Sequence, residues 1–322
     1  MREIFLNELG GFCVGNCSDK IGGTGVTALI FERGAVCGLD VRGGGPASRE
    51  SNLLNPLSAA EKIHAIVLSG GSAYGLDSAG GVMKFLEEKG IGFDTGYAKV
   101  PLVCASCIYD LCVGDPTCRP DRNMGYNAAK AAFDGDFEPG CNGVGTGATV
   151  GKLLGADYMM KSGLGVYACE TGGLKVAAIV AVNALGDVFE NDDIICGMYD
   201  SNAGRFLNTA EQMYASVKPK GNLFTSNTTI GAVVTNAAFS KSEMNKIAAM
   251  ASNGCARAIN PINTTADGDS IYAASTGEFA ADINIVGTLC ADAMQKAVVN
   301  AVKNSISMYN LKSYSDVFYA LG

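Results

Sequence analysis

The residues best suited to chemistry are Asn227-Thr228-Thr229, which open the apolar run Ile230–Val234. If the peptide bond before Thr228 breaks, Thr228 carries both a nucleophilic hydroxyl and a free α-amine, whose ordinary pKa is about 7.7 to 8.0. That amine can serve as the general base for its own hydroxyl. The chain holds one histidine, His64, so a Ser-His-Asp or Cys-His site could use only that residue. Taken alone, the tripeptide also suits a plain turn that leads into a strand.

Two carboxylates lie further along the chain, in Asp267-Gly268-Asp269. Asp-Gly is a common hairpin turn, which is the simpler interpretation. Carboxylates at positions i and i+2 of an extended segment, however, point the same way and could hold a protonated amine or order a proton path from hydroxyl to amine. A calcium loop is not favoured, because the other acidic ligands of that pattern are missing.

Two glycine-rich loops suggest anion binding, and the sequence supports one of them better than the other. Gly143–Ala148 satisfies a loose dinucleotide pattern, but a turn precedes it where a strand is needed, and Leu153 after Lys152 breaks the phosphate-loop pattern. Ser69–Gly75 follows an apolar run and precedes a helical pattern, a geometry that presents backbone N–H groups to a ligand. Close packing of strand on helix explains the second loop equally well.

The chain has twelve cysteines, most densely at Cys104, Cys107, Cys112 and Cys118. Zinc is the sharper interpretation of that cluster. The segment Val100–Val113 is instead extended and apolar, no second CxxC exists, and free cysteine behaves as a small hydrophobe. We therefore predict no metal, and no disulfides in a reducing compartment.

Short apolar runs bounded by turn residues predict buried strands, and amphipathic stretches predict helices. The predicted strands are Thr27–Phe31, Ala65–Leu68, Lys175–Val182 and Thr229–Thr235. The predicted helices are Asp77–Lys89, Lys241–Ala258 with a serine cap, and about Ala281–Met308. Strands that are apolar throughout indicate sheets covered on both faces, hence an α/β fold. The polar stretch Met198–Asn227 is typical of a surface segment, and it ends at the proposed cut.

With 48% hydrophobic and 17% charged positions among 322 residues, the composition indicates a compact folded protein. A net charge of −8, without any Lys/Arg block, argues against nucleic acid or an anionic membrane as the main partner. No apolar stretch approaches the roughly 18 residues of a membrane span, and the first residues lack the apolar core of a signal peptide. The predicted location is cytoplasmic.

Several motifs, in this order, resemble those of the DmpA-type aminopeptidases, a family that includes D-amidase/L-aminopeptidases, β-aminopeptidases and nylon-oligomer (6-aminohexanoate) hydrolases. The similarity covers nearly the whole chain. The motifs are Gly23–Thr27, Asp40–Pro46, Leu68–Asp77, Gly143–Lys152, Val182–Asp187, Asn227–Thr229 and Asp267–Asp269.

This resemblance implies a four-layer αββα sandwich of the kind shared with ornithine acetyltransferases. It also implies one hydrolase domain, 1–322, made as a precursor that cuts itself between Asn227 and Thr228. The products would be a large chain, 1–227, and a small chain, 228–322, that stay together. Relatives form tetramers or larger assemblies, so a homotetramer is expected.

The resemblance also assigns roles in the site. Thr228 would be the nucleophile, and Asn183 would donate its side-chain amide to the oxyanion, where a fixed dipole is needed. Lys152 would stand near the new amino terminus, and a nearby cation would lower the pKa of that amine. Asp267 and Asp269 would orient Thr228.

Tyr74, Ser72 and Gly71, which share one loop, would bind the substrate. Thr228 would first attack the carbonyl of Asn227, giving an ester that water opens, and would then form an acyl-enzyme with an amide or peptide substrate. No metal or organic cofactor is required.

The threonine nucleophile and paired aspartates look closer to the nylon-oligomer hydrolases than to the β-aminopeptidases. Asn236 stands where many relatives have aspartate, and we expect it to alter the charge near the small-chain terminus. A D- or β-aminopeptidase of the same family is the nearest alternative, and an acetyl-transferring ornithine enzyme is a second. A non-cleaving protein that binds an anion at Gly70-Gly71 or Gly145–Gly147 is a third.

Overall fold

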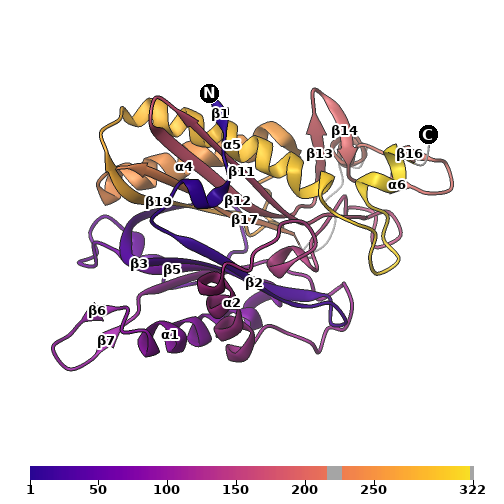
Figure 1. Ribbon diagram of the computed structural model, residues 1–322. Helices are drawn as coiled ribbons and strands as arrows, with labels where there is room; N and C mark the ends of the chain where they lie inside the picture. The colour runs from indigo at the N-terminus through magenta and orange to yellow at the C-terminus, as the bar shows by residue number, and fades with distance from the viewer. Residues whose placement is uncertain (216–226, 320–322) are drawn as a thin grey trace.

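The fold, known here from a computed structural model, has four layers (Figure 1). The structure describes residues 1–215 and 227–319. Two helices cover one outer face, two helices cover the other, and two β layers lie between them. The four-layer αββα sandwich predicted from the resemblance is therefore confirmed.

Within the described residues, both β layers belong to one ten-stranded sheet, in the order β1-β11-β12-β17-β19-β3-β5-β8-β4, with β2 also paired to β3. The first layer contains β1 (Arg2–Glu3), β11 (Leu164–Thr171), β12 (Leu174–Asn183), β17 (Thr228–Ala237) and β19 (Ser270–Phe279). The second contains β2 (Cys13–Asp19), β4 (Ala47–Arg49), β5 (Ile63–Ser69) and β8 (Val103–Cys107).

The long strand β3 (Thr24–Val41) belongs to both layers. Its first part pairs with β2 and β5, and its last part, from Val36, pairs with β19. The pairing with β5 shifts register between Ile30 and Ala35, and Gly34 has a left-handed φ of 70° at this point. A glycine is suited to such a backbone, because it has no Cβ to clash. The strand can thus leave one layer and enter the other.

The helices complete three apolar cores. Helices α1 (Ser78–Glu88) and α2 (Arg122–Asp134) cover the second layer, while α4 (Lys241–Ala258) and α5 (Ile283–Lys303) cover the first. A third core fills the space between the two β layers. Strands β12 and β17 are buried along almost their whole length, as expected of strands with cores on both faces.

Local signals explain where the helices begin and end. Ser240 caps α4 by accepting a hydrogen bond from the Glu243 N–H, while the Glu243 carboxylate accepts from the Ser240 N–H, which forms a capping box. The predicted helix after Asp77 begins one residue later, at Ser78, and follows the short 3-10 helix Ser72–Asp77. The predicted strands and helices are all present; Lys241–Ala258 has the predicted bounds, and the others have shifted ends. Helix α2, capped by Asp121, was not predicted.

The remaining elements are short. They are β6 (Phe93–Asp94), β7 (Lys99–Val100), β9 (Thr149–Val150), β10 (Met160–Lys161), β13 (Asp187–Glu190), β14 (Asp193–Cys196), β15 (Tyr199–Asp200), β16 (Arg205–Phe206), β18 (Ile259–Asn260), α3 (Thr209–Tyr214) and α6 (Tyr314–Phe318). The part of Met198–Asn227 that the structure describes holds β15, β16 and α3. Residues 216–226 of that stretch, like 320–322, lie outside the described residues.

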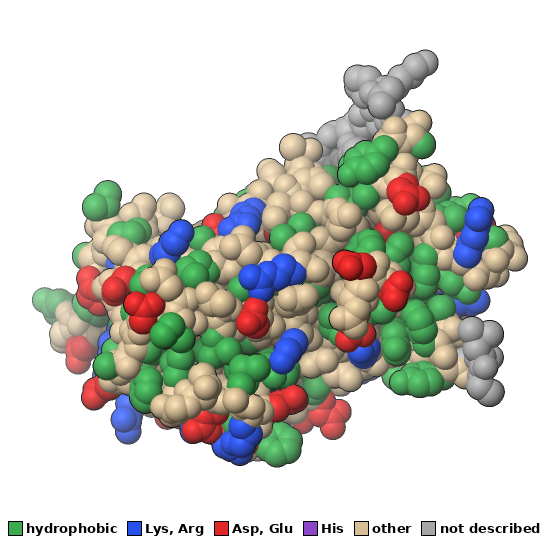
Figure 2. All heavy atoms as spheres, turned by 90° about the horizontal axis from the view of Figure 1, so that it is seen from above, with side chains coloured by type: hydrophobic (Ala, Val, Ile, Leu, Met, Phe, Trp, Pro, Cys, Tyr) green, Lys and Arg blue, Asp and Glu red, His purple; other side chains and the backbone are tan. Residues whose placement is uncertain are grey.

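Charged side chains of both signs are interspersed on the face seen from above (Figure 2). Lys and Arg do not merge there into a continuous basic area, which agrees with the acidic net charge. None of the helices that the structure describes has the length and apolar character needed to cross a bilayer.

Candidate active site

The pairing of β12 with β17 brings two predicted site residues together. Asn183 is the direct partner of Thr228 at the end of this antiparallel pair. Residues that lie opposite each other carry their side chains on the same face. Ile179 and Ala181 of β12, like Ile230 and Ala232 of β17, belong to the core between the β layers. By the alternation of strands, Asn183 and Thr228 face that same interior space.

The Thr228 hydroxyl lies directly against the carbonyl that it is predicted to attack. Thr228 is 5% exposed, and its Oγ1 donates a hydrogen bond to the carbonyl oxygen of Asn227. The N–H of Gly268 donates to the same oxygen at 3.1 Å. Asn227 also forms a parallel bridge with Asp267, which fixes the chain just before the proposed cut.

Burial of the Asn227 side chain is energetically unfavourable. The residue is 3% exposed, and within the described part of the chain neither its Nδ2 nor its Oδ1 has a hydrogen-bond partner. An unsatisfied buried polar group costs on the order of 1 to 3 kcal/mol. The uncut chain therefore holds Asn227 in an unfavourable environment that cleavage would allow it to leave.

Hydrogen bonds fix which way the Asn183 amide points. Its Oδ1 accepts from the Lys152 Nζ at 2.6 Å and from the Thr149 N–H at 3.1 Å, and its Nδ2 donates to the carbonyl of Tyr109 at 3.0 Å. Two donors at one end require that end to be the oxygen. The NH2 group must then project from the opposite end, as a donor to an oxyanion would.

Lys152 is held beside Asn183 by a second bond, from Nζ to the Asn183 carbonyl oxygen at 3.1 Å. Burial lowers the pKa of Lys152 to about 8, although Cys112, Asp267, Asp110 and Asp269 lie near enough to favour its charged form. A lysine with such a pKa is partly neutral near pH 8. Lys152 was expected near the new amino terminus; what the structure gives is its contact with Asn183 and the effect of the Asp267 and Asp269 charges on its ammonium group.

The two aspartates hold the start of β17 through its backbone. Asp269 Oδ1 accepts from the Thr229 N–H at 2.5 Å, and Oδ2 accepts from the Asn263 N–H at 3.0 Å. Burial raises the pKa of Asp269 to about 7, and repulsion from Asp267 adds to the effect. Burial raises the pKa of Asp267 as well. In the described residues Asp269 therefore fixes the neighbour of Thr228, and no hydrogen bond joins either carboxylate to the Thr228 hydroxyl.

A backbone clamp that sequence reasoning did not assign surrounds the aspartates. Gly45 N donates to the Asp267 carbonyl oxygen at 2.8 Å, and the Gly43 N–H donates to the Asp269 carbonyl oxygen at 3.3 Å. A Cβ on Gly43 would lie 2.3 Å from the Asp269 nitrogen, so only glycine allows this approach. The run Gly43–Gly45 was visible as a resemblance motif, but its role follows only from these contacts.

The predicted substrate loop is built around a buried carboxylate that sequence reasoning also missed. Asp110 Oδ1 accepts from the Gly71 N–H at 2.6 Å, and Oδ2 accepts from the Thr24 hydroxyl at 2.7 Å. Gly71 and Ser72 both have left-handed φ angles, 79° and 55°. Burial raises the pKa of Asp110, and its charge interacts with that of Lys152. The loop is thereby connected to the site.

Tyr74 projects from this loop into solvent. It is 60% exposed, and the Arg119 guanidinium carbon lies 3.8 Å from the centre of its ring. A guanidinium over an aromatic face is attractive and restrains the ring. No hydrogen bond described in the structure connects Gly71, Ser72 or Tyr74 to Thr228.

The loops that suggested an anion cradle use their N–H groups internally. The N–H of Gly70 donates to Gly25 O at 2.9 Å, and that of Ser72 donates to Ile108 O at 2.9 Å. Gly145 N donates to Asn142 O at 2.9 Å, and Thr146 N donates to Gly143 O at 3.1 Å. Donors already bonded within the chain are not available to an anion, so the geometry disfavours the anion-binding alternative.

In the part of the chain that is described, most of the cysteines and the single histidine are buried, whereas Cys112 is exposed. Cys104 and Cys107 are buried, and burial raises the pKa of Cys104 to about 12. His64 is 9% exposed, and its Nδ1 accepts from the Leu102 N–H at 3.1 Å. Among residues 1–215 and 227–319, no three His, Cys, Asp or Glu side chains gather as metal ligands would.

The expectation for Asn236 is wrong. Asn236 Nδ2 donates to Gly173 O at 2.9 Å and its Oδ1 accepts from Lys175 N at 2.8 Å, at the opposite end of β17 from Thr228. Eight residues of strand separate the two by roughly 26 Å, too far to affect the charge at the new terminus. An aspartate could not make the bond to Gly173 O, since a carboxylate does not donate.

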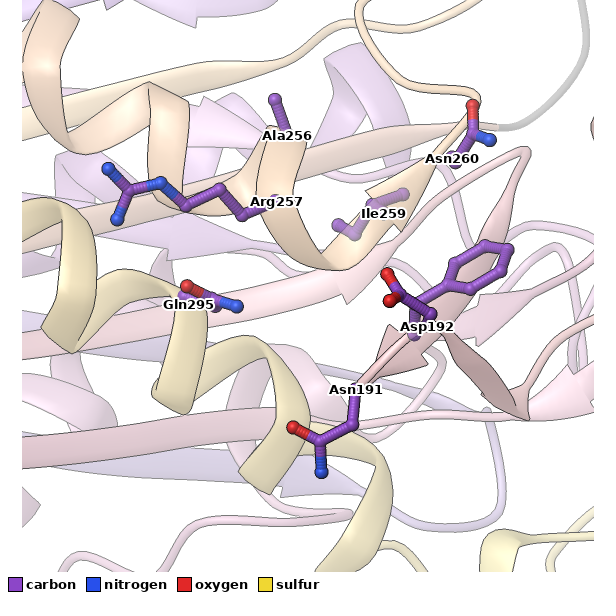
Figure 3. Close-up of a pocket in the computed structure, with 8 residues that line it drawn as sticks. Asn191, Asp192, Ala256, Arg257, Ile259, Asn260 and Gln295 are labelled. Atoms are coloured by element: carbon purple, nitrogen blue, oxygen red, sulfur yellow. The ribbon is translucent and has the colours of Figure 1, made fainter.

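A surface hollow of about 410 Å³ lies elsewhere, between the C-terminal end of α4 with β18, the middle of α5 and the β13–β14 hairpin (Figure 3). It is lined by Phe189, Asn191, Asp192, Arg257, Asn260 and Gln295, among others. None of the predicted site residues takes part. Arg257, its cation, is bonded to Asp292 at 2.6 Å. The hollow therefore offers no assembled chemistry comparable to that around Thr228.

The chain is similar to a known peptidase family and to several named proteins. The profile of peptidase family S58 matches residues 6–313. An uncharacterized aminopeptidase of Mycobacterium leprae is 36% identical over 315 residues, which cover 91% of this chain and 86% of that protein. A 6-aminohexanoate-oligomer endohydrolase of Kocuria sp. is 29% identical over 319 residues, covering 94% of this chain and 87% of that protein.

Solved structures share the fold at lower sequence identity. A β-aminopeptidase of Burkholderia sp. superposes with a TM-score of 0.72 at 17% identity, covering 98% of this chain and 92% of that chain. An L-aminopeptidase D-Ala-esterase/amidase of Ochrobactrum anthropi, described as a new variant of the Ntn hydrolase fold, has a TM-score of 0.64 at 16% identity. The superposition covers 92% of this chain and 85% of that chain.

Proposed function

Because the chain belongs to peptidase family S58 and is a hydrolase of amide bonds, we propose that it cuts itself before Thr228 and then uses Thr228 as an N-terminal nucleophile. One contact supports this bond as the site of cleavage. The Thr228 hydroxyl bonds to the carbonyl oxygen of Asn227, the residue directly before it. A nucleophile placed against its target carbonyl needs little further ordering to attack.

Self-cleavage converts the amide bond between Asn227 and Thr228 into an ester, and hydrolysis of the ester then gives two chain termini. Thr228 Oγ attacks the Asn227 carbonyl carbon, the hydroxyl proton passes to the Thr228 nitrogen, and the C–N bond breaks. Water then opens the ester, leaving a carboxylate on Asn227 and a free hydroxyl and amine on Thr228. In the mature enzyme that amine takes the hydroxyl proton as Oγ attacks a substrate amide, and water releases the acyl group in a second step.

The surrounding residues support specific roles in turnover. We assign Asn183 as the side-chain donor to the substrate oxyanion, because it faces the same space as Thr228 and its amide orientation is fixed. We assign Lys152 to lowering the pKa of the Thr228 amine, since it approaches the same end of the strands. Asp267 and Asp269 hold the start of β17 so that Thr228 stays in place.

For the substrate, we propose a short linear amide, either an amino-acid amide or peptide or an oligomer of 6-aminohexanoate. Support comes from relatives with both kinds of name, at 36% and 29% identity. We place the substrate contact at Tyr74, with Gly71 and Ser72 shaping its loop. Turnover of L-, D- and β-aminoacyl anilides, compared with that of 6-aminohexanoate oligomers, would separate the aminopeptidase and endohydrolase assignments.

The decisive experiment is the intact mass of the purified protein under denaturing conditions. The parent and Thr228→Ser should give fragments 1–227 and 228–322, because both retain a hydroxyl, whereas Thr228→Ala should remain whole. A parent that stays uncut after long incubation, or a Thr228→Ala chain that is cut at the same bond, would overturn the proposal.

We further propose a homotetramer in the cytoplasm, in line with the family resemblance. Light scattering after size-exclusion chromatography tests the assembly, and fractionation of the producing cells tests the location.

A further inference from the structure

The carbonyl oxygen of Asn227 has a backbone donor that the assigned roles do not use. Gly268 N–H donates to it at 3.1 Å, alongside the Thr228 hydroxyl. When Thr228 Oγ bonds to the Asn227 carbonyl carbon, the π electron pair of that carbonyl moves onto this oxygen. The negative charge of the tetrahedral intermediate therefore develops where the Gly268 N–H already points.

The Gly268 N–H is held in position by the loop around it. The Asp267 carboxylate accepts from the Thr264 N–H at 2.7 Å and from the Thr264 hydroxyl at 2.6 Å, while the Asp267 carbonyl accepts from Gly45 N at 2.8 Å. These bonds fix the peptide unit that carries the Gly268 N–H. A donor fixed before the reaction needs no rearrangement as charge appears, which makes it effective.

The identity of residue 268 fits the same function. A Cβ on Gly268 would lie 2.9 Å from Thr228 Oγ1 and 2.9 Å from Gly45 O. Real Cβ atoms essentially never approach so closely, so a side chain here would displace the nucleophile or the loop. Only glycine lets the N–H reach the Asn227 carbonyl while leaving room for the hydroxyl that attacks it.

Asn183 contacts other groups in the uncut chain. Its Nδ2 donates to Tyr109 O, and its Oδ1 is held by Lys152 and Thr149. The described hydrogen bonds to the Asn227 oxygen come from Gly268 and Thr228. We infer, on the basis of the proposed function, that the Gly268 N–H is the oxyanion donor for self-cleavage, whereas Asn183 serves the later reaction with substrate.

Replacement of Gly268 by glycolic acid tests this directly. The substitution turns the amide between residues 267 and 268 into an ester, so it deletes the N–H and adds no side chain. Loss of one oxyanion donor lowers rates by about a hundred- to a thousandfold. We expect self-cleavage, followed by intact mass over time, to slow by that factor. Turnover per cleaved molecule should stay within a few-fold of the parent.

A matched control separates loss of the donor from disturbance of the loop. The ester at 268 also weakens the Asp267 carbonyl as an acceptor for the Gly45 N–H. Glycolic acid in place of Gly45 removes that same bond from its donor side but keeps the Gly268 N–H. We expect this control to slow cleavage far less than the ester at 268, because the two bonds from Thr264 to the Asp267 carboxylate still hold the loop and the Gly268 N–H is kept.

Three results would overturn the inference. The ester at 268 could cleave at the parent rate, the control could slow as much as the ester at 268, or turnover could fall as much as cleavage. Each differs from failure of the proposed function, which would appear as a parent that does not cut itself or a Thr228→Ala chain that does. Cleavage in the parent together with a hundredfold slower ester at 268 is the result we expect.

Discussion

Lys152 allows a direct test of whether a buried residue of the proposed site lowers the stability of the folded chain. Its ammonium end contacts the buried Asn183, at 2.6 Å from Oδ1 and 3.1 Å from the carbonyl oxygen. Burial lowers its pKa from 10.5 to about 8. The unfolded chain therefore binds a proton at this lysine more readily than the folded chain does, so protonation favours unfolding at neutral pH. Replacement by methionine removes this dependence.

The pKa of Lys152 falls from 10.5 to about 8 on folding, and each pKa unit corresponds to about 1.36 kcal/mol. The free energy of unfolding at pH 7 is therefore about 3 kcal/mol lower than it would be with a neutral lysine. This contribution is fully present above pH 10.5 and is lost as the pH falls through 8. About 2 kcal/mol of it returns between pH 7 and about pH 9.5. The stability of the parent, relative to Lys152→Met, should rise by that amount over this range.

The assay is urea unfolding at a series of pH values, with both chains carrying Thr228→Ala so that neither is expected to cut itself. Contributions from all other titrating groups largely cancel in the difference between the two chains. Lys84→Met is a matched control, because the Lys84 side chain is 70% exposed and keeps most of its hydration on folding. Any pH dependence that Lys84→Met shares with Lys152→Met reflects the loss of a lysine in general, so only the excess at Lys152 is counted.

The reasoning would be refuted if the free energy of unfolding of the parent, relative to that of Lys152→Met, stayed constant from pH 7 to 9.5. It would also be refuted if the parent became less stable relative to the variant over that range. Either result would mean that the lysine keeps its ordinary affinity for protons in the folded chain. The site could then not combine a neutral lysine with the aspartates near pH 8.

Three further predictions concern the reaction itself. Gly268→Ala should slow self-cleavage on the order of a hundredfold in a mass time course, because its Cβ would crowd Thr228 Oγ1 at 2.9 Å; an unchanged rate would contradict this. Turnover by the mature enzyme should fall as the pH drops through about 7, where Asp269 gains a proton and accepts less well from the Thr229 N–H, and a profile flat from pH 5 to 9 would contradict it. Tyr74→Ala should raise KM several-fold without slowing cleavage, since Tyr74 is exposed and apart from the cut.

Four buried strands of the sheet could be predicted because their apolar runs are short and bounded by turn residues. Their register could not. Lys175–Val182 and Thr229–Thr235 are apolar on both faces, so no alternation in the sequence indicates which residues pair. The pairing of Asn183 with Thr228, which brings the proposed oxyanion donor and the proposed nucleophile onto one face, follows only from the structure.

Helix α2 was missed for a physical reason. Its first turns contain Gly125 and asparagines, residues with poor helix propensity. The structure shows why Gly125 is required: a Cβ there would lie 1.8 Å from the Ser78 carbonyl oxygen of α1. The glycine that weakens the local signal is the one that lets the two helices pack closely.

The residues of the proposed site could be named from the sequence, but their contacts could not. Motifs pointed to Thr228, Asn183 and the aspartates, whereas the contacts of the Gly268 N–H and the Asp110 carboxylate had no signal that a single sequence reveals. A backbone donor is common to every residue except proline, so its use depends on where the fold aims it. Asp110 is isolated in sequence from the glycine turn that it holds.

The strand order β12-β17-β19-β3 has a consequence for the protein after it is cut. Strands β17 and β19 come from residues after Thr228, and the strands on either side come from residues before it. Cleavage therefore turns a one-chain folding equilibrium into a two-chain one, in which apparent stability depends on protein concentration. Fragments that separate must then find each other again by diffusion. The mature enzyme should persist because it comes apart slowly, and a melted sample should recover less readily than the uncut precursor.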